Sequence, residues 1–368
     1  MHDDSISSML AERIAAGDFP SAVYVVAEGA SVRLADALGL AVKDTKQHAA
    51  TLDTIYDLAS LTKPLVTGLL CALFFERGAL KLDDSAARYL PEFDTNDKRA
   101  LTIRQLLTHT SGLPAWRPLY LIANGDKERA LQAISGEPLE SQPGAQVRYS
   151  DLGFITLGFL LERLQNAPLA EIARREIFEP LKLRRTFFNP DKALITEIAA
   201  CEMGNVYECE TCGGEQADSY AWRKNLIWGE VHDGNAHFLG GAAGHAGLFS
   251  TARETFRLAT QFFAAYTELL KPETCALFRT NLTKGMEEAR SVGWQLAATQ
   301  DSTAGANLSP DSFGHLGFTG TSCWNDPVHA RTFILLTNRT HARSLPFVNI
   351  NSVRRRFHTL AVESLDRN

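Results

Sequence analysis

Segments with the pattern of β-strands lie only near the two ends of this 368-residue chain. Each is rich in β-branched and aromatic residues and is bounded by turn-forming residues. They are residues 21–29, 30–39, 291–296, 313–326 and 330–340. Because strands at both ends must share a sheet to bury their apolar faces, we predict an α+β fold. Its antiparallel five-stranded sheet is formed from both ends of the chain and is flanked by helices.

The middle of the chain favours helices and loops, which predicts an inserted helical lobe. We expect residues 81–245 to form this lobe, and residues 1–80 and 246–368 to form the sheet-containing lobe. In the helical lobe, Thr102 is a candidate N-cap, because threonine there can accept a backbone N–H bond. Further helices are predicted near residues 4–16 and 347–364.

Ser60 and Lys63 stand three residues apart in the stretch LASLTKPLVT, where a helix is predicted to start. Three residues are close to one helical turn, so the two side chains share a face. Pro64 supports a nearby helix start, and the apolar run that follows predicts a buried helix with Gly78 as its cap. A serine beside a lysine on a rigid helix suits a nucleophile, although a solvated surface lysine has the same spacing.

A serine nucleophile needs a group that takes its proton. Lys63 can do so only when neutral, and burial in an apolar helix pushes a lysine in that direction. Tyr149 and Asp151, in VRYSDLGF, lie two residues apart and point to one side if the segment is extended. The alternative for Tyr149 is a buried phenol with a hydrogen-bonded tip. Residues 314–322, GHLGFTGTS, predict a strand whose backbone passes close to a ligand.

These signals follow one another in an order that resembles the serine β-lactamase and penicillin-binding protein superfamily. SLTK at 60–63 matches the SxxK motif, YSD at 149–151 is similar to the YxN motif, and HLG at 315–317 takes the place of KTG. Four further runs are similar to runs found in the branch that contains class C β-lactamases, D-aminopeptidases and family VIII esterases. They are residues 106–114, 231–236, 243–251 and 317–322. The resemblance covers roughly residues 15–345 and implies a two-lobe β-lactamase/transpeptidase-like fold.

The resemblance also implies roles for individual residues. Ser60 would be the acylated nucleophile, and Lys63 with Tyr149 would form the proton-transfer pair. The oxyanion hole would be formed by the backbone N–H groups of Ser60 and Phe318, and preorganised donors of this kind are worth about 10²–10³ in rate each. Residues that would bind substrate are Asp151, His315 and Gly317.

Three positions depart from the superfamily pattern. Asp151 replaces an asparagine, His315 replaces a lysine, and Leu316 replaces a hydroxyl residue. An unperturbed histidine has a pKa of about 6.5, so at about pH 8 His315 would give anionic substrates no counter-charge. The sequence therefore favours a serine hydrolase that forms an acyl-enzyme with small esters or peptide-like amides.

Other activities stay open at this stage. Within enzymes the alternatives are a D-aminopeptidase, a DD-peptidase or a weak β-lactamase. From another class, the alternative is a catalytically silent module that binds cell-wall peptides. The presence of Ser60, Lys63 and Tyr149 together argues against a silent module, which would not need all three.

The charge pattern argues against large anionic partners. The formal net charge is −6, and the longest basic run, residues 354–356, is predicted to be the solvated face of the last helix. The first ten residues carry two aspartates where a signal peptide would carry positive charge, and no apolar run is long enough to span a bilayer. We therefore expect a cytoplasmic protein that binds a small substrate and neither nucleic acid nor membrane.

Six cysteines are expected to be free thiols in that compartment. Cys209 and Cys212, in CETC, could bind zinc together with Cys201 and either His232 or His237. A second close cysteine pair is missing, and the superfamily chemistry needs no metal. We therefore expect neither a metal nor a cofactor.

Two histidine-containing runs outside these motifs are given structural roles. His109, in THTSG, is expected to fix a turn by hydrogen bonding. His232, Asp233 and Asn235 are expected to form a satisfied polar network near the junction of the lobes. The glycine-rich run at 240–250 lacks phosphate-loop spacing, so it is predicted to be a tightly packed wall.

Overall fold

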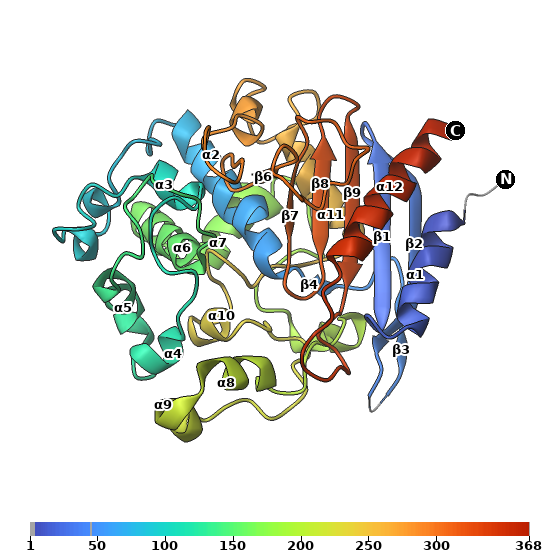
Figure 1. Ribbon diagram of the computed structural model, residues 1–368, viewed down its shortest axis with the longest axis horizontal. Helices are drawn as coiled ribbons and strands as arrows, with labels where there is room; N and C mark the ends of the chain where they lie inside the picture. The colour runs from blue at the N-terminus through green and yellow to red at the C-terminus, as the bar shows by residue number, and fades with distance from the viewer. Residues whose placement is uncertain (1–3, 45, 368) are drawn as a thin grey trace.

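A computed structural model describes residues 4–44 and 46–367, and its main feature is a seven-stranded antiparallel sheet (Figure 1). The strand order is β3-β2-β1-β9-β8-β7-β6. The strands are β1 Ser21–Glu28, β2 Ser31–Val42, β3 His48–Ala49, β6 Gln295–Leu296, β7 Phe313–Leu316, β8 Ser322–Asp326 and β9 Arg331–Thr337. The α+β class and the antiparallel sheet are thus confirmed.

The prediction of five strands was wrong, for two reasons. The segment 313–326 contains two strands, because the turn at 317–321 divides it into β7 and β8. In that turn Gly320 has a φ of +106°, which a residue with a side chain rarely adopts. The edge strand β3 has only two residues, which is too short to show the alternation that predicts a strand.

The two ends of the chain meet in the middle of the sheet. Strand β1 pairs with its neighbour β2 on one side and with β9 on the other, from Ala22 opposite Thr337 to Glu28 opposite Arg331. Every residue of β1 except Glu28 is buried. Alternate β1 side chains enter two different apolar clusters, so both faces of this strand are covered.

Helices cover the sheet on both sides (Figure 1). Helices α1 Ser5–Ala15 and α12 Asn351–Arg367 pack on one face, where Ile6 and Phe357 join the same cluster. On the other face lie α11 Ala252–Ala259 and the helix α2 Leu69–Glu76, whose side chains belong to the larger cluster. The first and last predicted helices are therefore present, with slightly different bounds.

The segment that carries Ser60 is helical but irregular. A 3₁₀ turn at Ala59–Leu61 leads into a π-helical stretch at Lys63–Gly68, and α2 follows directly. Residues 59–76 are long and apolar enough to cross a membrane by composition, yet 83% of them lie inside the protein, as in a core helix. The helix ends as predicted, because Gly78 adopts a φ of +68° just beyond it.

The remaining helices lie beside the sheet, to its left in Figure 1. The predicted cap is confirmed, because Thr102 forms a capping box with Gln105. The helices are α3 Ile103–Leu107, α4 Leu119–Ile122, α5 Ala130–Gly136, α6 Asp151–Gln165, α7 Leu169–Ala173, α8 Val206–Cys212, α9 Gly214–Ser219 and α10 Gly234–Phe238. A separate pair of short strands, β4 Tyr56–Asp57 and β5 Phe249–Ser250, lies just before the Ser60 turn.

Candidate active site

A strained turn holds Ser60 in place. Ala59, immediately before it, has a φ of +48°, which is uncommon for a residue with a side chain. The turn is braced by Asp57, whose carboxylate accepts hydrogen bonds from the backbone N–H groups of Ala59 and His232, both at 2.8 Å. Burial raises the pKa of Asp57. These hydrogen bonds hold the strained turn, and with it Ser60, in one conformation before any substrate binds. Strained backbone held by its surroundings in this way is common at functional sites.

Lys63 lies against Ser60 and is completely buried. Its Nζ donates to Ser60 Oγ at 2.8 Å and to the carbonyl of His245 at 3.2 Å, and it lies 2.8 Å from Asp151 Oδ1. Burial lowers the pKa of Lys63, but the charge of Asp151 and the hydrogen bonding to Asp151 and Tyr149 outweigh burial, and the net shift is upward. The expectation that burial would make Lys63 neutral was therefore wrong, because a carboxylate lies next to it.

Asp151 reaches Lys63 from the start of a helix. Ser150 is the N-cap of α6, and its hydroxyl accepts the N–H of Gly153 at 3.2 Å. Ser150 itself has extended backbone angles, with φ −136° and ψ 119°, and the expected extended segment ends there because Asp151 is the first helical residue. Both Tyr149 and Asp151 nevertheless line the same pocket as Ser60.

The phenol of Tyr149 is buried beside the nucleophile. Burial is the largest effect and, with the charge of Asp151, raises the pKa of Tyr149, whereas the charge of Lys63 and the hydrogen bonds to Lys63 and Ser60 lower it. Its ring lies 4.5 Å from the ring of His109 and 5.8 Å from that of His315. Tyr149 is therefore a protonated phenol, placed where it can donate a hydrogen bond.

The two flanking histidines are buried. Nδ1 of His109 accepts the N–H of Ser150 at 3.0 Å, and His109 has a φ of +59°, so its predicted role in fixing a turn is confirmed. In the ring of His315, Nδ1 donates to the carbonyl of Leu316 at 2.8 Å. Burial, with smaller effects of the Lys63 and Arg290 charges, lowers the pKa of His315 well below its ordinary value. The expectation of an unperturbed histidine was wrong.

Arg290 is a site residue that the sequence analysis missed. It is buried, and its Cζ lies 5.7 Å from the centre of the Tyr149 ring. Its Nε donates to Glu288 at 2.9 Å. No motif surrounds Arg290 in the sequence, and it reaches the site from a loop just before β6, so only the tertiary fold reveals it.

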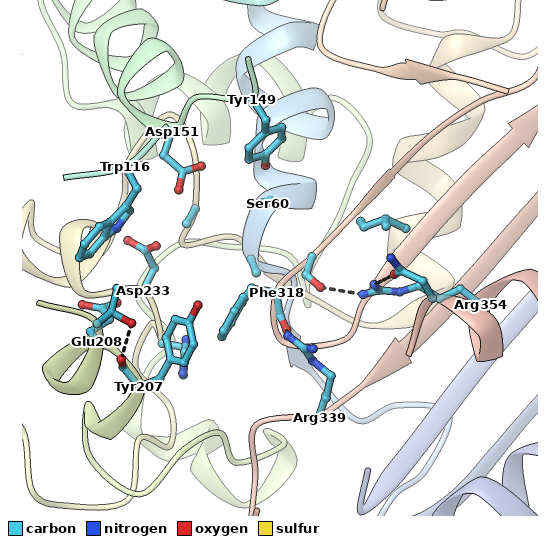
Figure 2. Close-up of a pocket in the computed structure, with 17 residues that line it drawn as sticks. Ser60, Trp116, Tyr149, Asp151, Tyr207, Glu208, Asp233, Phe318, Arg339 and Arg354 are labelled. Atoms are coloured by element: carbon cyan, nitrogen blue, oxygen red, sulfur yellow. Dashed lines mark hydrogen bonds between the residues drawn. The ribbon is translucent and has the colours of Figure 1, made fainter. Parts of the chain in front are cut away.

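The pocket above Ser60 has a volume of about 490 Å³. Figure 2 shows the carboxylates of Asp151, Asp233 and Glu208 on one side and the guanidinium groups of Arg339 and Arg354 on the other. The pocket is therefore acidic at one end and basic at the other.

The turn between β7 and β8 forms another wall of the pocket. The hydroxyls of Thr319 and Thr321 donate to the carbonyls of Asp57 and Leu58 at 2.8 and 2.9 Å. A Cβ on Gly317 would lie 2.0 Å from Oγ1 of Thr321, so this close approach requires glycine. The contacts bring Phe318 to the pocket beside Ser60 (Figure 2). Gly317 and Leu316 line the same wall.

Two arginines, Arg354 and Arg339, lie behind the turn between β7 and β8, and the first corrects an expectation from the sequence. Arg354 is only 5% exposed, so the prediction that residues 354–356 lie on a solvated face was wrong for it. Its Nη2 donates to the carbonyls of Gly317 and Thr321 at 2.8 and 2.9 Å, while Nε and Nη2 of Arg339 donate to the carbonyl of Phe318 at 3.0 and 2.7 Å. Burial lowers the pKa of Arg354 to about 9. Within the described residues both guanidinium groups donate to backbone carbonyls, Arg354 also donates to the Asn351 side chain, and neither is ion-paired with a carboxylate.

The side chains of His232, Asp233 and Asn235 are each hydrogen-bonded, as predicted, but each has its own partners. His232 contacts Glu202 at 2.9 Å through Nε2, and Asp233 contacts His245 at 2.8 Å. The Asn235 side chain accepts from the N–H of Leu119 and donates to the carbonyl of Arg117, both at 2.8 Å. The glycine-rich run is a tight wall as predicted, because a Cβ on Gly244 would lie 2.0 Å from the carbonyl oxygen of Phe154.

The cysteines of the zinc alternative do not converge in the part of the chain that the structure describes. Cys209 and Cys212 lie one turn apart in α8, whereas Cys201 is buried elsewhere, and all are free thiols. Among the described residues, the potential metal ligands that come together are Asp151, Asp233 and His245. The Lys63 ammonium already lies against Asp151, so a positive charge is present at that position.

Glu208 provides a test of the pocket's electrostatics. It accepts hydrogen bonds from Tyr120 Oη at 2.8 Å and from the N–H of Gly234 at 2.7 Å. Burial, with the charge of Asp233, raises its pKa from 4.5 to about 7. The folded protein therefore keeps a proton on Glu208 at pH values where the unfolded chain has released it. The contribution of this protonated carboxyl group to the free energy of unfolding is fully present below about pH 4.5 and is lost as the pH rises to about 7.

Glutamine cannot ionise. We therefore expect the stability of Glu208→Gln, compared with that of the wild type, to be more favourable at alkaline pH than at acidic pH. The melting temperature of the variant minus that of the wild type should be higher at about pH 8 than at about pH 5. Thermal unfolding at both values measures this. An unchanged difference would mean that Glu208 titrates normally.

Comparison with known protein families adds independent evidence. The family model described as Beta-lactamase matches residues 6–352. A protein of Escherichia coli (strain K12) named putative D-alanyl-D-alanine carboxypeptidase is 35% identical, and the match covers 80% of this chain and 71% of that protein. A protein of the same name from Salmonella agona is 34% identical, with coverage of 82% and 73%.

Solved structures share the fold at lower sequence identity. The hydrolase EstCE1, described as having promiscuous acyltransferase activity, has a TM-score of 0.73 and 22% identity, and the match covers 98% of this chain and 97% of that one. A class C beta lactamase from Rhodobacter sphaeroides has a TM-score of 0.73 and 19% identity, with full coverage of both chains. At these identities the likeness establishes the fold alone.

Proposed function

The chain belongs to the beta-lactamase family and is a serine hydrolase of that superfamily, and from this premise we propose that it forms an acyl-enzyme at Ser60. Its substrates are small esters or peptide-like amides. One observation carries the proposal: Ser60 Oγ, Lys63 Nζ and Asp151 Oδ1 are joined by two 2.8 Å contacts at the edge of a pocket large enough for a small molecule.

The pocket supports each part of acyl transfer. Ser60 lines it and can reach a carbonyl carbon, while the backbone at Ser60 and Phe318 is the predicted oxyanion hole. Tyr149 can donate a proton to a leaving group, because its phenol is protonated and interacts with Ser60. Lys63 holds Ser60 by a direct hydrogen bond. An amine and a phenol thus lie beside the Ser60 hydroxyl in one pocket, which argues against a silent binding module.

The two arginines favour a second candidate, a peptidase for substrates that end in a carboxylate. Arg354 is buried without a carboxylate partner among the described residues, and its Nε has no hydrogen-bond partner. A buried cation that is not compensated within the protein is costly unless a ligand supplies the charge. Arg339 adds a second cation on the same side. The names of the relatives from Escherichia coli and Salmonella agree with this candidate.

A matched pair of substrates tests the second candidate. We expect a short peptide ending in D-alanyl-D-alanine to be hydrolysed with a kcat/KM at least about tenfold above that of its C-terminal carboxamide, because only the free acid offers a carboxylate to Arg339. Arg339→Gln should narrow this ratio and leave hydrolysis of an uncharged p-nitrophenyl ester much less affected. Equal turnover of acid and amide would contradict the second candidate and leave the ester proposal in place.

A further inference from the structure

The resting state of the site leaves open which group takes the proton of Ser60. Lys63 is an ammonium with a raised pKa, so it has no lone pair to offer. Tyr149 is a phenol that burial keeps protonated. Neither group of the predicted proton-transfer pair can therefore act as a base without first losing its own proton.

Asp151 is the base nearest to Lys63. Its Oδ1 forms an ion pair with Lys63 Nζ at 2.8 Å, and Nζ donates a hydrogen bond to Ser60 Oγ at 2.8 Å, so Nζ contacts both oxygen atoms. Asp151 lines the pocket and its side chain is 18% exposed, whereas the Lys63 side chain is fully buried. Water in the pocket can therefore reach Asp151 but not Lys63, and a substrate that fills the pocket removes that water.

We propose that Asp151 is the final acceptor of the Ser60 proton and acts through Lys63. The inference rests on the proposed function, because it requires Ser60 to be the nucleophile. In the first transfer, an N–H proton of Lys63 moves to Asp151, which leaves a neutral amine and a carboxylic acid. In the second, the Ser60 hydroxyl proton moves to the amine as Oγ bonds to the substrate carbonyl carbon, whose π electrons move to the carbonyl oxygen.

The net result of these steps balances. One proton has moved from Ser60 to Asp151, Lys63 is again an ammonium, and the substrate is a tetrahedral oxyanion. When this intermediate collapses, the bond to the leaving group breaks and Tyr149 or Lys63 donates a proton to that group. Asp151 then returns its proton through Lys63, which restores the resting ion pair.

Exclusion of water is the physical reason for the first transfer. In a wet pocket the ion pair is stable, because water solvates Asp151. In a dry pocket two buried charges are costly, so the neutral amine and carboxylic acid become accessible. The other titratable or charged groups that lie near Lys63 and Asp151 come from several elements: Tyr149 before α6, Asp233 before α10, His245 before β5, His109 after α3, His315 on β7 and Arg290 before β6.

The pH dependence of acylation tests the relay. The measurement is the burst of leaving group from an uncharged p-nitrophenyl ester in a single turnover, between about pH 6 and pH 10. We expect Asp151→Asn to acylate about 10²-fold more slowly than wild type near pH 7. Without the carboxylate the pKa of Lys63 falls, and Lys63 must lose its proton to solvent. The acylation rate of the variant should therefore increase as the pH rises and approach the wild-type rate.

Two further variants serve as controls. Asp233→Asn removes another carboxylate of the pocket, and its acylation profile should keep the wild-type shape whatever its overall rate. Asp151→Glu keeps a carboxylate, so it should retain a wild-type profile at a reduced rate, and it provides the test if Asp151→Asn does not fold.

Two results would overturn the relay: an Asp151→Asn rate equal to wild type near pH 7, or a loss by one constant factor at every pH. Failure of the proposed function looks different. In that case a fluorophosphonate would still label a Ser60→Ala protein, whatever the pH profile of the Asp151 variants. Labelling that depends on Ser60, together with an unchanged Asp151→Asn profile, would refute the relay alone.

Discussion

Ser60→Ala is expected to abolish both covalent labelling by a fluorophosphonate and turnover of every ester and amide substrate. The variant lacks the oxygen that forms the acyl bond, so no acyl-enzyme can accumulate. Removal of a nucleophile of this kind typically costs about 10⁶ in kcat, which is the largest effect that we predict. Labelling stoichiometry by intact-protein mass spectrometry, with peptide mapping of the adduct, measures the result.

The loss must be separated from unfolding. The Ser60 side chain is small, its Oγ accepts a hydrogen bond from Lys63, and replacement by alanine leaves the apolar core intact. The melting temperature should therefore change little. Ser135→Ala, in α5 and away from the pocket lining, is the matched control and should label fully. Stoichiometric labelling of Ser60→Ala would place the nucleophile elsewhere.

Lys63→Met is expected to reduce acylation by about 10²–10⁴ and also to destabilise the protein. Methionine has a similar length but has neither the hydrogen bond to Ser60 nor the charge beside Asp151. Breaking a buried ion pair from one side leaves the other charge uncompensated. Because Asp151 reaches the pocket, we expect the loss of stability to be at most about 3 kcal/mol.

A double variant distinguishes the two effects of Lys63→Met. In Lys63→Met/Asp151→Asn the unpaired carboxylate is gone, so most of the lost stability should return. Acylation should stay low, because no amine lies next to Ser60. Chemical denaturation and single-turnover acylation of the four proteins in this cycle measure both. Recovery of activity in the double variant would show that Lys63 matters only as a counter-ion.

The sequence predicts the elements whose signals are local. The SxxK spacing placed Ser60 beside Lys63 because one helical turn is a property of the backbone. The cap at Thr102 was predictable for the same reason, since its partner Gln105 is three residues away. The long strands β1 and β9 are apolar enough to be recognised without knowledge of their partners.

Features that depend on tertiary packing were not predictable. The charged state of Lys63 is set by Asp151, which is 88 positions away, and the neutral state of His315 is set by burial. Arg290 and Arg354 reach the site from a loop and from the last helix, and no local pattern separates them from solvated arginines. The strand count failed at β3, whose two residues pair only because β2 lies beside them.

The pairing of β1 with β9 has a consequence for synthesis of the protein. A ribosome makes β1 and the Ser60 segment long before β9, so the inner edge of β1 has no partner for most of translation. Contacts of such large sequence separation form late and slowly, and an unpaired apolar strand edge invites association with other chains. The turn that carries Phe318 and the helix that carries Arg354 are also synthesised late. The emerging chain thus needs protection at this edge until the end of translation, and it gains hydrolytic activity only when its last quarter has folded.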